Sequence, residues 1–411
     1  MKRRVVITGM GIVSPVGNDL KTAWRNILNG FSGIDKITRF DVNSSDIKIK
    51  IAGEVKNFDI TKYISFKQAR NMDTFLHYGI AAGIQAWNDS QIKINEVNSE
   101  RIGVLIGSGI GGLPRIENTK FDYIRRGARR ISPFFIPSSL INMINGQLSI
   151  KYGIKGPSYS VVSACTTSLH CIGDASRIIE YGDADVMLTG GSDSTISPLG
   201  IGGFAAMKAL SKRNHDPKTA SRPWDIDRDG FVLGEGSGVL ILEEYEHAKK
   251  RHAKIYGEIS GYGMSTDAYH ITSPNKDGPY RGMLNALKNG NINIDEIDYV
   301  NAHGTSTKIG DQNENDALKL TFKNYSKNLI ISSTKSMTGH LLGAAGGIEA
   351  IFTVLSVYNQ VCPPTINIFN QDPRCELNYC PNLAKPMKIR NAISNSFGFG
   401  GTNGSIIISK I

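Results

Sequence analysis

The chain contains 411 residues, of which 40% are hydrophobic and 20% are charged. That composition supplies enough apolar side chain for a large core, and it excludes a disordered chain or a small disulfide-stabilised peptide. Lysine and arginine number 47 against 37 for aspartate and glutamate, so the net charge is +10. This mild excess favours an anionic partner without specifying a nucleic acid.

Two segments need to be distinguished from targeting or membrane signals. The basic residues 2–4 precede an apolar run, as in an export signal, but glycines and Pro15 interrupt that run. Residues 341–358 are long and apolar enough to suggest a membrane span, but Glu349 lies near their centre. We therefore expect no signal peptide, no membrane association, and a buried core helix at 341–358.

A strand, a glycine turn and a helix are predicted at the start of each half of the chain. Residues 5–8 lead through Gly9 and Gly11 to a helix near 19–29. Residues 256–260 lead in the same way through Gly261 and Gly263 to a helix near 280–289. This parallel plan predicts a duplication.

Short apolar strands and helical patterns alternate along the rest of the chain. Strands are predicted at 104–106, 158–162, 186–188, 239–242, 297–300 and 329–332, and helices at 140–152, 167–181 and 311–322. This alternation is typical of an α/β protein with largely parallel sheets. We expect two similar α/β halves, at 1–255 and 256–411.

The run Gly107-Ser108-Gly109-Ile110-Gly111-Gly112 fits the dinucleotide-binding pattern after a predicted strand. That fingerprint also needs an acidic residue about 20 positions later. The chain has Arg129 and Arg130 there. We therefore expect no nucleotide site.

The cysteines provide a candidate nucleophile. Cys165 lies where a predicted strand ends and a helix rich in small residues begins. A thiol at a helix N-terminus experiences the positive end of the helix dipole, which favours thiolate over the ordinary pKa of about 8.5. A buried structural cysteine is the alternative. The full set, Cys165, Cys171, Cys362, Cys375 and Cys380, is odd in number and lacks repeated Cys-x-x-Cys spacing, so we expect no metal site, no disulfide framework and a cytoplasmic protein.

Two histidines follow predicted strands in the second half of the chain. His303 precedes Gly304-Thr305-Ser306-Thr307, and His340 ends Lys335-Ser336-Met337-Thr338-Gly339-His340. The ends of strands in open α/β sheets are common places for active sites, so both are candidate catalytic residues. Packed or surface histidines are the alternative. Residues 395–404 predict a tight hairpin, whose glycines can also direct backbone N–H groups at an oxyanion.

Taken in chain order, these motifs resemble the β-ketoacyl-acyl carrier protein synthases, most closely the type II elongating form. The likeness runs from residues 5–11, through the cysteine turn and both histidine motifs, to residues 397–403. It implies a thiolase-like fold, in which duplicated α/β halves form a five-layered αβαβα body, and a homodimer. It also implies decarboxylative condensation in fatty acid elongation.

The resemblance assigns roles to the site residues. Cys165 would hold the acyl group, and His303 and His340 would stabilise the enolate that malonyl carrier protein forms on decarboxylation. Lys335 and Glu349 would orient and tune the histidines. The backbone N–H groups of Cys165 and Phe399 would bind the oxyanion, with the Phe399 side chain as a gate. The implied substrate-binding residues are Thr305 and Thr307 for the pantetheine arm, and Ile110 and Phe204 for the acyl chain.

The implied partner is acyl carrier protein, in acyl and malonyl forms. It would bring the 4′-phosphopantetheine arm, so we expect the enzyme to need no cofactor of its own. The family's docking regions correspond to basic residues for which a solvated surface is the alternative: Lys67, Arg70, Arg125, Arg126, Arg129 and Arg130.

Other functions fit the sequence less well. A polyketide-type ketosynthase and a thiolase-like acyltransferase are the closest alternatives. Thiolases pair the nucleophile with a histidine and a second cysteine, whereas the later half of this chain has His340. Non-catalytic chain-length factors lack the active cysteine. No nucleic-acid-binding motif accompanies the positive charge, so we expect no nucleic acid partner.

Overall fold

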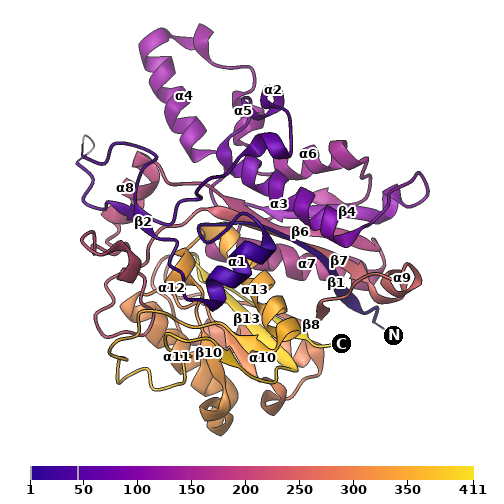
Figure 1. Cartoon of the computed structure of the whole chain (residues 1–411), viewed down its shortest axis with the longest axis vertical. Helices are drawn as coiled ribbons and strands as arrows, with labels where there is room; N and C mark the ends of the chain where they lie inside the picture. Colours follow the sequence, from indigo (N-terminus) through magenta and orange to yellow (C-terminus); the bar gives the residue numbers. More distant parts are fainter. Residues whose placement is uncertain (1, 44–45) are drawn as a thin grey trace.

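Ten strands form one central sheet, in a computed structural model that describes residues 2–43 and 46–411 (Figure 1). Their order across the sheet is β10-β9-β13-β14-β8-β1-β7-β6-β4-β5. The first half of the chain contributes β1 (Val5–Val13), β4 (Ile102–Gly107), β5 (Ser158–Tyr159), β6 (Val186–Asp193) and β7 (Gly236–Glu244). The second half contributes β8 (Gly257–Thr266), β9 (Tyr299–Asn301), β10 (Ile330–Ser332), β13 (Asn391–Gly398) and β14 (Thr402–Ser409).

The two halves have the same topology. When the strands of each half are numbered from one to five along the chain, both halves have the spatial order 1-5-4-2-3. In each half the pairs 4-2 and 2-3 are parallel, and the pairs 1-5 and 5-4 are antiparallel. The first strands, β1 and β8, pair through Val6–Glu258 and Ile7–Gly257 and join the halves. The predicted duplication is therefore confirmed.

The expectation of largely parallel sheets is wrong. Parallel pairing is confined to three strands at each end of the large sheet, where connections through helices return the chain in the same direction. The central strands are antiparallel. In the second half this follows from the tight hairpin between β13 and β14, which confirms the turn predicted at 395–404.

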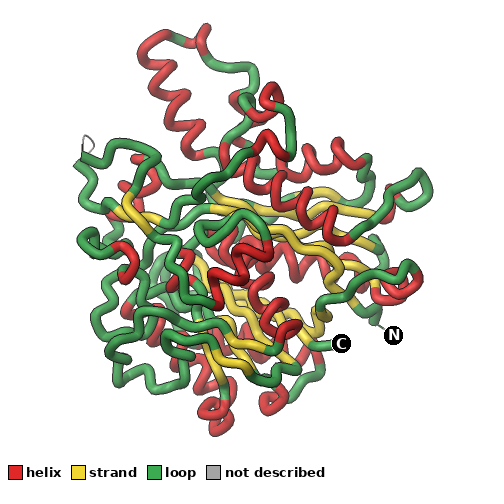
Figure 2. The backbone as a smooth tube through the Cα atoms, in the orientation of Figure 1, coloured by secondary structure: helices red, strands yellow, loops and turns green. Residues whose placement is uncertain are grey.

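Helices cover the sheet in layers (Figure 2). Helix α3 (Thr74–Ser90) packs on the outer face of the first half, and α10 (Asp277–Gly290) packs on the outer face of the second, with α11 (Lys308–Phe322) beside it. Between the halves lie α7 (Thr167–Tyr181) and α13 (Ala345–Asn359), which contact each other and strands of both halves. The five strands of each half thus form one β layer, with α7 and α13 between the two layers and α3 and α10 outside them. This is the expected αβαβα arrangement.

The remaining helices and strands lie around this body. The helices are α1 (Leu20–Leu28), α2 (Phe66–Ala69), α4 (Leu113–Arg126), α5 (Phe135–Ser139), α6 (Met143–Tyr152), α8 (Pro198–Ala206), α9 (Tyr245–Lys250) and α12 (Lys335–Thr338). Two small sheets pair β2 (Asp35–Lys36) with β3 (Ile51–Ala52), and β11 (Val361–Cys362) with β12 (Lys385–Pro386). Helix α4 projects from the body at the top of Figure 1. The predicted boundary at 255 falls between α9 and β8.

The apolar segment near the C-terminus is a core helix, as predicted. Residues Leu342–Asn359 are long and apolar enough to resemble a membrane span, but 89% of them are buried inside the protein. Glu349, the charge within this segment, is also buried, and it pairs with Lys335. A lysine partner inside the fold explains how a carboxylate is accommodated in so apolar a helix.

The glycine turns predicted after the first strand of each half are wrong. Strand β1 continues through Gly9 and Gly11 to Val13, and β8 continues through Gly261 and Gly263. A Cβ atom on Gly11 would lie 2.0 Å from a backbone oxygen of α3, and one on Gly263 would lie 2.2 Å from a backbone oxygen of α10. The glycines therefore let a helix pack closely on the strand, which makes α3 rather than α1 the counterpart of α10.

Candidate active site

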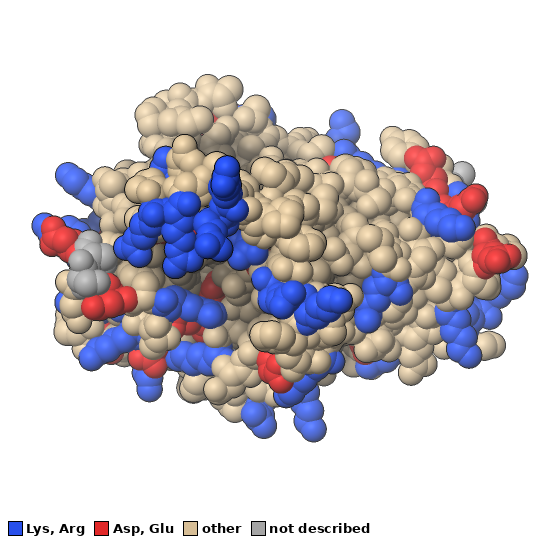
Figure 3. All heavy atoms as spheres, turned by 90° about the horizontal axis from the view of Figure 1, so that it is seen from above, with Lys and Arg blue, Asp and Glu red and all other residues tan. Residues whose placement is uncertain are grey.

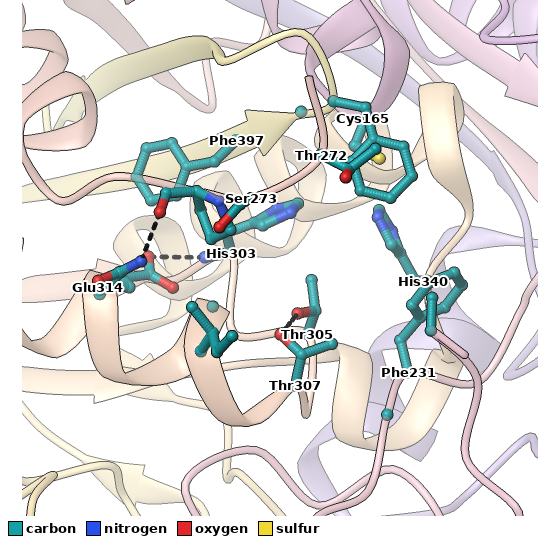
Figure 4. Close-up of a pocket in the computed structure, with 18 of the residues that line it drawn as sticks. Cys165, Phe231, Thr272, Ser273, His303, Thr305, Thr307, Glu314, His340 and Phe397 are labelled. Carbon is teal, nitrogen blue, oxygen red and sulfur yellow. Dashed lines mark hydrogen bonds between the residues drawn. The ribbon is translucent and has the colours of Figure 1, made fainter. Parts of the chain in front are cut away.

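Residues from both halves line a cavity of about 610 Å³. The first half supplies Cys165 and Phe204. The second supplies His303, His340, both threonines of the His303 motif, and Phe399. In the close-up view, Cys165 and the two histidine rings point toward a common space (Figure 4). The structure thus brings together the nucleophile and histidines that the sequence analysis singled out.

Cys165 lies in a strained turn that leads into α7. Ala164, immediately before it, has φ of 51°, a left-handed conformation that costs a residue with a Cβ atom free energy. A short 3₁₀ turn, Ala164–Thr166, then joins α7 at Thr167. This turn places the cysteine at the N-terminus of a 15-residue helix and at the wall of the cavity.

Burial opposes the thiolate that the sequence analysis expected. It raises the pKa of Cys165 to about 12, while the positive charge of Lys335 and the backbone N–H of Phe399 act in the opposite direction. The helix N-terminus is present as predicted, but the desolvation of the buried thiol outweighs these stabilising groups. The Phe399 N–H hydrogen-bonds the Cys165 side chain, so it is directed at the place where a bound carbonyl would react.

His303 and His340 face each other at right angles. Their ring centroids are 5.2 Å apart and their planes differ by 87°. His303 follows β9, and His340 is held by a hydrogen bond from its backbone N–H to the Val232 carbonyl oxygen, at 2.8 Å. Burial lowers the pKa of each histidine well below 6.5, and the charge of Lys335 lowers it further. Both imidazoles are therefore neutral at physiological pH, so each carries one N–H donor.

Lys335 and Glu349 form an ion pair behind the histidines. Both side chains are almost completely buried, at the start of α12 and within α13. The positive charge acts on both histidines and on Cys165. Because a buried charge is costly without a partner, Glu349 allows the lysine to remain near the cavity. This arrangement explains physically how Lys335 can keep the histidines neutral.

Thr305 and Thr307 lie on one wall of the cavity. Their Oγ1 atoms are 3.0 Å apart and interact with each other. Ser306, between them, points into the protein, where its Oγ accepts a hydrogen bond from the Arg222 backbone N–H at 3.0 Å. The alternation leaves two hydroxyl groups on the wall of the cavity.

The two residues assigned to the acyl pocket differ in position. Phe204 lines the cavity, next to Phe231. Ile110 does not line it, and its side chain is 40% exposed. The loop that carries Ile110 is closed around the buried Asp193, whose carboxylate accepts hydrogen bonds from Gly109 N–H at 2.9 Å and Ile110 N–H at 3.3 Å. An internal carboxylate thus occupies the N–H groups that would hold a phosphate in a nucleotide site.

Several cavity residues were not identified from the sequence. Glu314, in α11, accepts hydrogen bonds from the backbone N–H groups of His303 at 2.9 Å and Gly304 at 2.7 Å, and burial raises its pKa to about 7. Phe231 and Phe397 pack against His340 and His303. The sequence signal available for Glu314 was its spacing of three residues from Asp311 within the predicted helix 311–322, which places the two acids on one face. The aromatic residues gave no comparable signal.

The six basic residues assigned to carrier docking are exposed, but they lie outside the cavity. Lys67 and Arg70 lie on or beside the short helix α2. The other four lie at the end of α4 and in the following turn, Ala128–Arg130: Arg125, Arg126, Arg129 and Arg130. Seen from above, one side of the molecule carries a cluster of Lys and Arg side chains beside a hollow (Figure 3).

Comparisons with known proteins define the family. Residues 2–248 match the N-terminal domain of β-ketoacyl synthases, and residues 256–369 match the C-terminal domain. The chain belongs to the β-ketoacyl synthase family. It is 53% identical to 3-oxoacyl-[acyl-carrier-protein] synthase 2 of Vibrio harveyi and 52% identical to that of Coxiella burnetii, over 100% of this chain and 99% of each relative.

Solved β-ketoacyl synthase structures share the fold. A β-ketoacyl synthase from Burkholderia phymatum aligns with a TM-score of 0.92 at 33% identity, over the full length of both chains. A type II polyketide ketosynthase, solved in complex with its acyl-carrier protein and bound to a hexaketide, aligns with a TM-score of 0.93 at 33% identity, also over both full chains. The thiolase-like fold expected from the sequence is therefore confirmed.

Proposed function

We propose that the protein is a 3-oxoacyl-[acyl carrier protein] synthase of fatty acid elongation. The observation that carries this proposal is the placement of Cys165, His303 and His340 around one cavity, with Lys335 behind the histidines. A nucleophile with two neutral imidazoles suits a reaction that first forms an acyl-enzyme and then generates a carbanion. The identities of 52–53% to two 3-oxoacyl-[acyl-carrier-protein] synthases support the same activity.

In the first step, the Cys165 sulfur attacks the carbonyl carbon of an acyl thioester. The tetrahedral intermediate carries a negative oxygen, and the backbone N–H groups of Cys165 and Phe399 stabilise it. Collapse of the intermediate breaks the bond to the pantetheine sulfur, which leaves as a thiol with the proton that the Cys165 thiol gives up. The acyl chain remains on Cys165, and the carrier departs. Lys335 assists because its positive charge favours the thiolate against the effect of burial.

In the second step, the malonyl thioester loses its carboxylate as carbon dioxide. The electron pair of the broken bond passes into an enolate, whose oxygen accepts hydrogen bonds from the N–H groups of His303 and His340. The enolate carbon then attacks the acyl carbonyl on Cys165 and expels the thiolate. The product is a 3-oxoacyl thioester, longer by two carbons. Neutral imidazoles suit this role, since each keeps one N–H to donate.

Fatty acid elongation is favoured over polyketide synthesis by degree of similarity. The identity to the polyketide ketosynthase is 33%, against 53% to the Vibrio harveyi relative. Both classes use the same chemistry at the cysteine, so the distinction rests on the acyl chain accepted. Phe204 and Phe231 give the cavity an apolar wall suited to a saturated hydrocarbon chain.

Substitution of the nucleophile tests the proposed activity. Cys165→Ala should abolish formation of the acyl-enzyme, detected by intact mass after mixing with an acyl carrier thioester, and should lower condensation by at least roughly 10³-fold. Folding should be retained, because the side chain loses only its sulfur. Cys375→Ala, outside the cavity, serves as the control. An acyl-enzyme of normal yield in Cys165→Ala would contradict the proposal.

We further propose that the partner is an acyl carrier protein whose 4′-phosphopantetheine arm enters past Thr305 and Thr307. The arm would supply the reactive thioester, so the enzyme needs no cofactor of its own. Its docking surface would be the basic residues of α2 and of the α4 end, and their exposure and positive charge support an acidic partner. The structurally similar ketosynthase solved with its acyl-carrier protein gives independent support.

We also propose that the protein is a homodimer. Strand β5 lies at one end of the large sheet, where its outer edge is unpaired by any described strand. Tyr159 and Val162, in and beside this edge, are 42% and 57% exposed, and Phe134 and Ile136 add exposed apolar surface near α5. An apolar sheet edge favours pairing with a second copy. Light scattering should give twice the chain mass, and Val162→Lys should shift the protein toward monomer; a monomeric wild type would contradict the proposal.

A cytoplasmic location is proposed from the cysteines. All five are thiols in the structure, which suits a reducing compartment. Cell fractionation followed by immunodetection tests this location. Recovery of the protein in a membrane or exported fraction would contradict it.

A further inference from the structure

Two cysteines outside the cavity lie beside each other. Cys362 ends β11, where it pairs with Lys385 of β12. Cys380 lies on a neighbouring segment, and its carbonyl oxygen accepts a hydrogen bond from the Thr365 N–H at 3.0 Å. Thr365 and Pro381 form a parallel bridge that aligns the two segments. The side chains of Cys362 and Cys380 interact with each other. Each sulfur also donates to a nearby carbonyl oxygen at 3.3 Å, Cys362 to Pro363 and Cys380 to Leu383.

The surroundings of this pair differ from those of the other cysteines. Cys171 and Cys375 are buried beside carboxylates, arginines or backbone groups, and Cys165 faces the cavity. Among the described residues, Cys362 and Cys380 are the two cysteines whose side chains interact with each other. Neither lines the cavity. They are therefore available for chemistry that acyl transfer does not use.

The two thiols are unequal in a way that suits a stepwise reaction. The interaction with Cys362 lowers the pKa of Cys380, and the positive charge of Lys385 acts in the same direction. Burial instead raises the pKa of Cys362 well above its usual value. Cys380 is 4% exposed and is followed by an exposed turn that contains Leu383, whereas Cys362 is fully buried. Cys380 is thus the thiol that a small oxidant reaches first.

Cys380 also has a strained backbone. Its φ is 49°, in the left-handed region that glycine and asparagine adopt more readily than cysteine does. Its N–H is held by the Asn378 side chain at 3.1 Å, and its sulfur donates to the Leu383 carbonyl oxygen at 3.3 Å. The surrounding contacts therefore fix a cysteine, in an unfavourable conformation, against a second cysteine.

We propose that Cys362 and Cys380 form an oxidation site, separate from the catalytic cysteine, that a hydroperoxide converts into an intrachain disulfide. The Cys380 thiolate attacks the peroxide, the O–O bond breaks, and the sulfur becomes a sulfenic acid as an alcohol or water leaves. The Cys362 sulfur then attacks that sulfur, loses its proton, and expels water as the S–S bond forms. Two thiols are oxidised and one peroxide is reduced.

The disulfide would close the irregular segment 363–379, which lies behind the cavity wall. Thr365 Oγ1 accepts a hydrogen bond from Ser333 N–H at 2.9 Å, and Ser333 Oγ donates to the Gly304 carbonyl oxygen at 2.7 Å. Asp372 pairs with Arg228 at 2.9 Å, and Arg228 donates to the Thr307 carbonyl oxygen at 3.3 Å. Closing this segment restricts the unfolded chain, so oxidation should stabilise the region that supports the His303 motif.

Peptide mapping of the full-length wild-type protein tests the proposal. The folded protein is treated with one equivalent of hydrogen peroxide, its remaining thiols are alkylated after denaturation, and it is digested without reduction. We expect a linked peptide pair containing Cys362 and Cys380, lighter than the sum of its two parts by two hydrogen atoms. The melting temperature should rise by roughly a few degrees and return after treatment with dithiothreitol.

Variants provide the matched controls. Cys380→Ser and Cys362→Ser should each lose both the linked peptide and the rise in melting temperature, while Cys375→Ser should keep both. The peptide mapping of wild type does not depend on any variant folding, so it tests the proposed disulfide by itself. If peroxide oxidises Cys165 while Cys362 and Cys380 both remain free thiols that are fully alkylated, the proposal is overturned. It is also overturned if the linked peptide forms only when the protein is oxidised in urea.

Discussion

The two halves of the molecule contain the same left-handed turn beside the cavity, but the residue after the turn differs between them. Ala164 and Leu342 both have φ of 51°, and each begins a 3₁₀ turn that leads into a helix of the middle layer, α7 or α13. In the first half the next residue is Cys165. In the second half it is Gly343, where a Cβ atom would lie 2.3 Å from the Gly109 N atom. One turn presents the proposed nucleophile, and the other allows close packing against the loop held by Asp193.

This comparison shows how a duplicated fold acquires an asymmetric active site. The second half contributes its chemistry from the residues just before and beside its turn, with His340 two positions ahead of Leu342 and His303 after the neighbouring strand β9. The first half contributes the thiol from the turn itself. Equivalent backbone positions therefore do not predict equivalent roles, and each role depends on the side chain present.

The largest loss of activity that separates the two halves is expected from substitution of the histidines. His303→Ala or His340→Ala should reduce decarboxylation of malonyl carrier protein by roughly 10²–10⁴-fold, because each removes an N–H donor to the enolate. At least one of the two variants should still form the acyl-enzyme at Cys165. Release of labelled carbon dioxide and intact mass separate the two steps. Wild-type decarboxylation by both variants would show that the second half does not perform this step.

Enlarging the glycine of the second turn should affect stability. Gly343→Ala should lower the free energy of unfolding by about 2–4 kcal/mol, because the new methyl group meets the Gly109 backbone and the Asp193 carboxylate. Gly202→Ala is the matched control, since a Cβ atom there meets nothing within 4 Å. Urea unfolding measures both. Equal stability of the two variants would mean that the contact at Gly343 does not constrain the turn.

The neutral histidines should make stability depend on pH. Their folded pKa values lie below the ordinary 6.5, so above pH 6.5 they are neutral in both states and have no effect. Below 6.5 only the unfolded chain binds the protons, so stability falls, with a slope of up to about 1.4 kcal/mol per pH unit per histidine.

His303→Asn isolates this contribution. Burial raises the folded pKa of Glu314 to about 7, which has the opposite effect as pH falls from 7 toward 4.5. The difference in unfolding free energy between wild type and His303→Asn removes this shared contribution, because Glu314 binds only backbone groups of residues 303 and 304. Below pH 6.5, the unfolding free energy of wild type should fall relative to that of His303→Asn. A difference that does not change with pH would mean that His303 is protonated in the folded protein.

The smallest effect is expected far from both turns. Reversing Arg129 and Arg130 to Glu should raise the apparent KM for acyl carrier protein by on the order of tenfold at low salt, and by less as salt screens the charges. Reaction with a small pantetheine thioester should change little. Reversal of the exposed Lys249 and Lys250 in α9 is the control. Equal loss with both substrates would place the arginines in the fold or active site rather than in docking.

The motifs that line the cavity could be singled out from the sequence because they are unusual short runs of cysteine, histidine, glycine and hydroxyl residues. The structure places Cys165, His303 and His340 at one cavity. Of the three, only His303 comes directly after an apolar strand, because β5 ends at Tyr159 and α12 lies between β10 and His340. Glycines were harder to interpret. Gly9 and Gly11 suggest a turn in a linear sequence, but their function depends on a helix that begins more than sixty residues later.

Other features could not be predicted because they depend on contacts between distant segments. The loop that carries Ile110 is held by the distant Asp193, and the Ile110 side chain does not line the cavity that contains Cys165. Thr272 and Ser273 line the cavity from a loop whose sequence gives no sign of it. The raised pKa of Cys165 follows from burial, which a helix-dipole argument from sequence does not contain.

The most direct test of the account is the product of the complete reaction. Purified protein is incubated with an acyl carrier protein thioester and malonyl carrier protein, and the products are identified by mass. We predict a 3-oxoacyl carrier protein two carbons longer than the starting acyl chain, with one carbon dioxide released for each product formed. An unextended acyl chain moved to another thiol, or a product that retains the malonyl carboxylate, would contradict the central claim that Cys165 and the two histidines together perform a decarboxylative condensation.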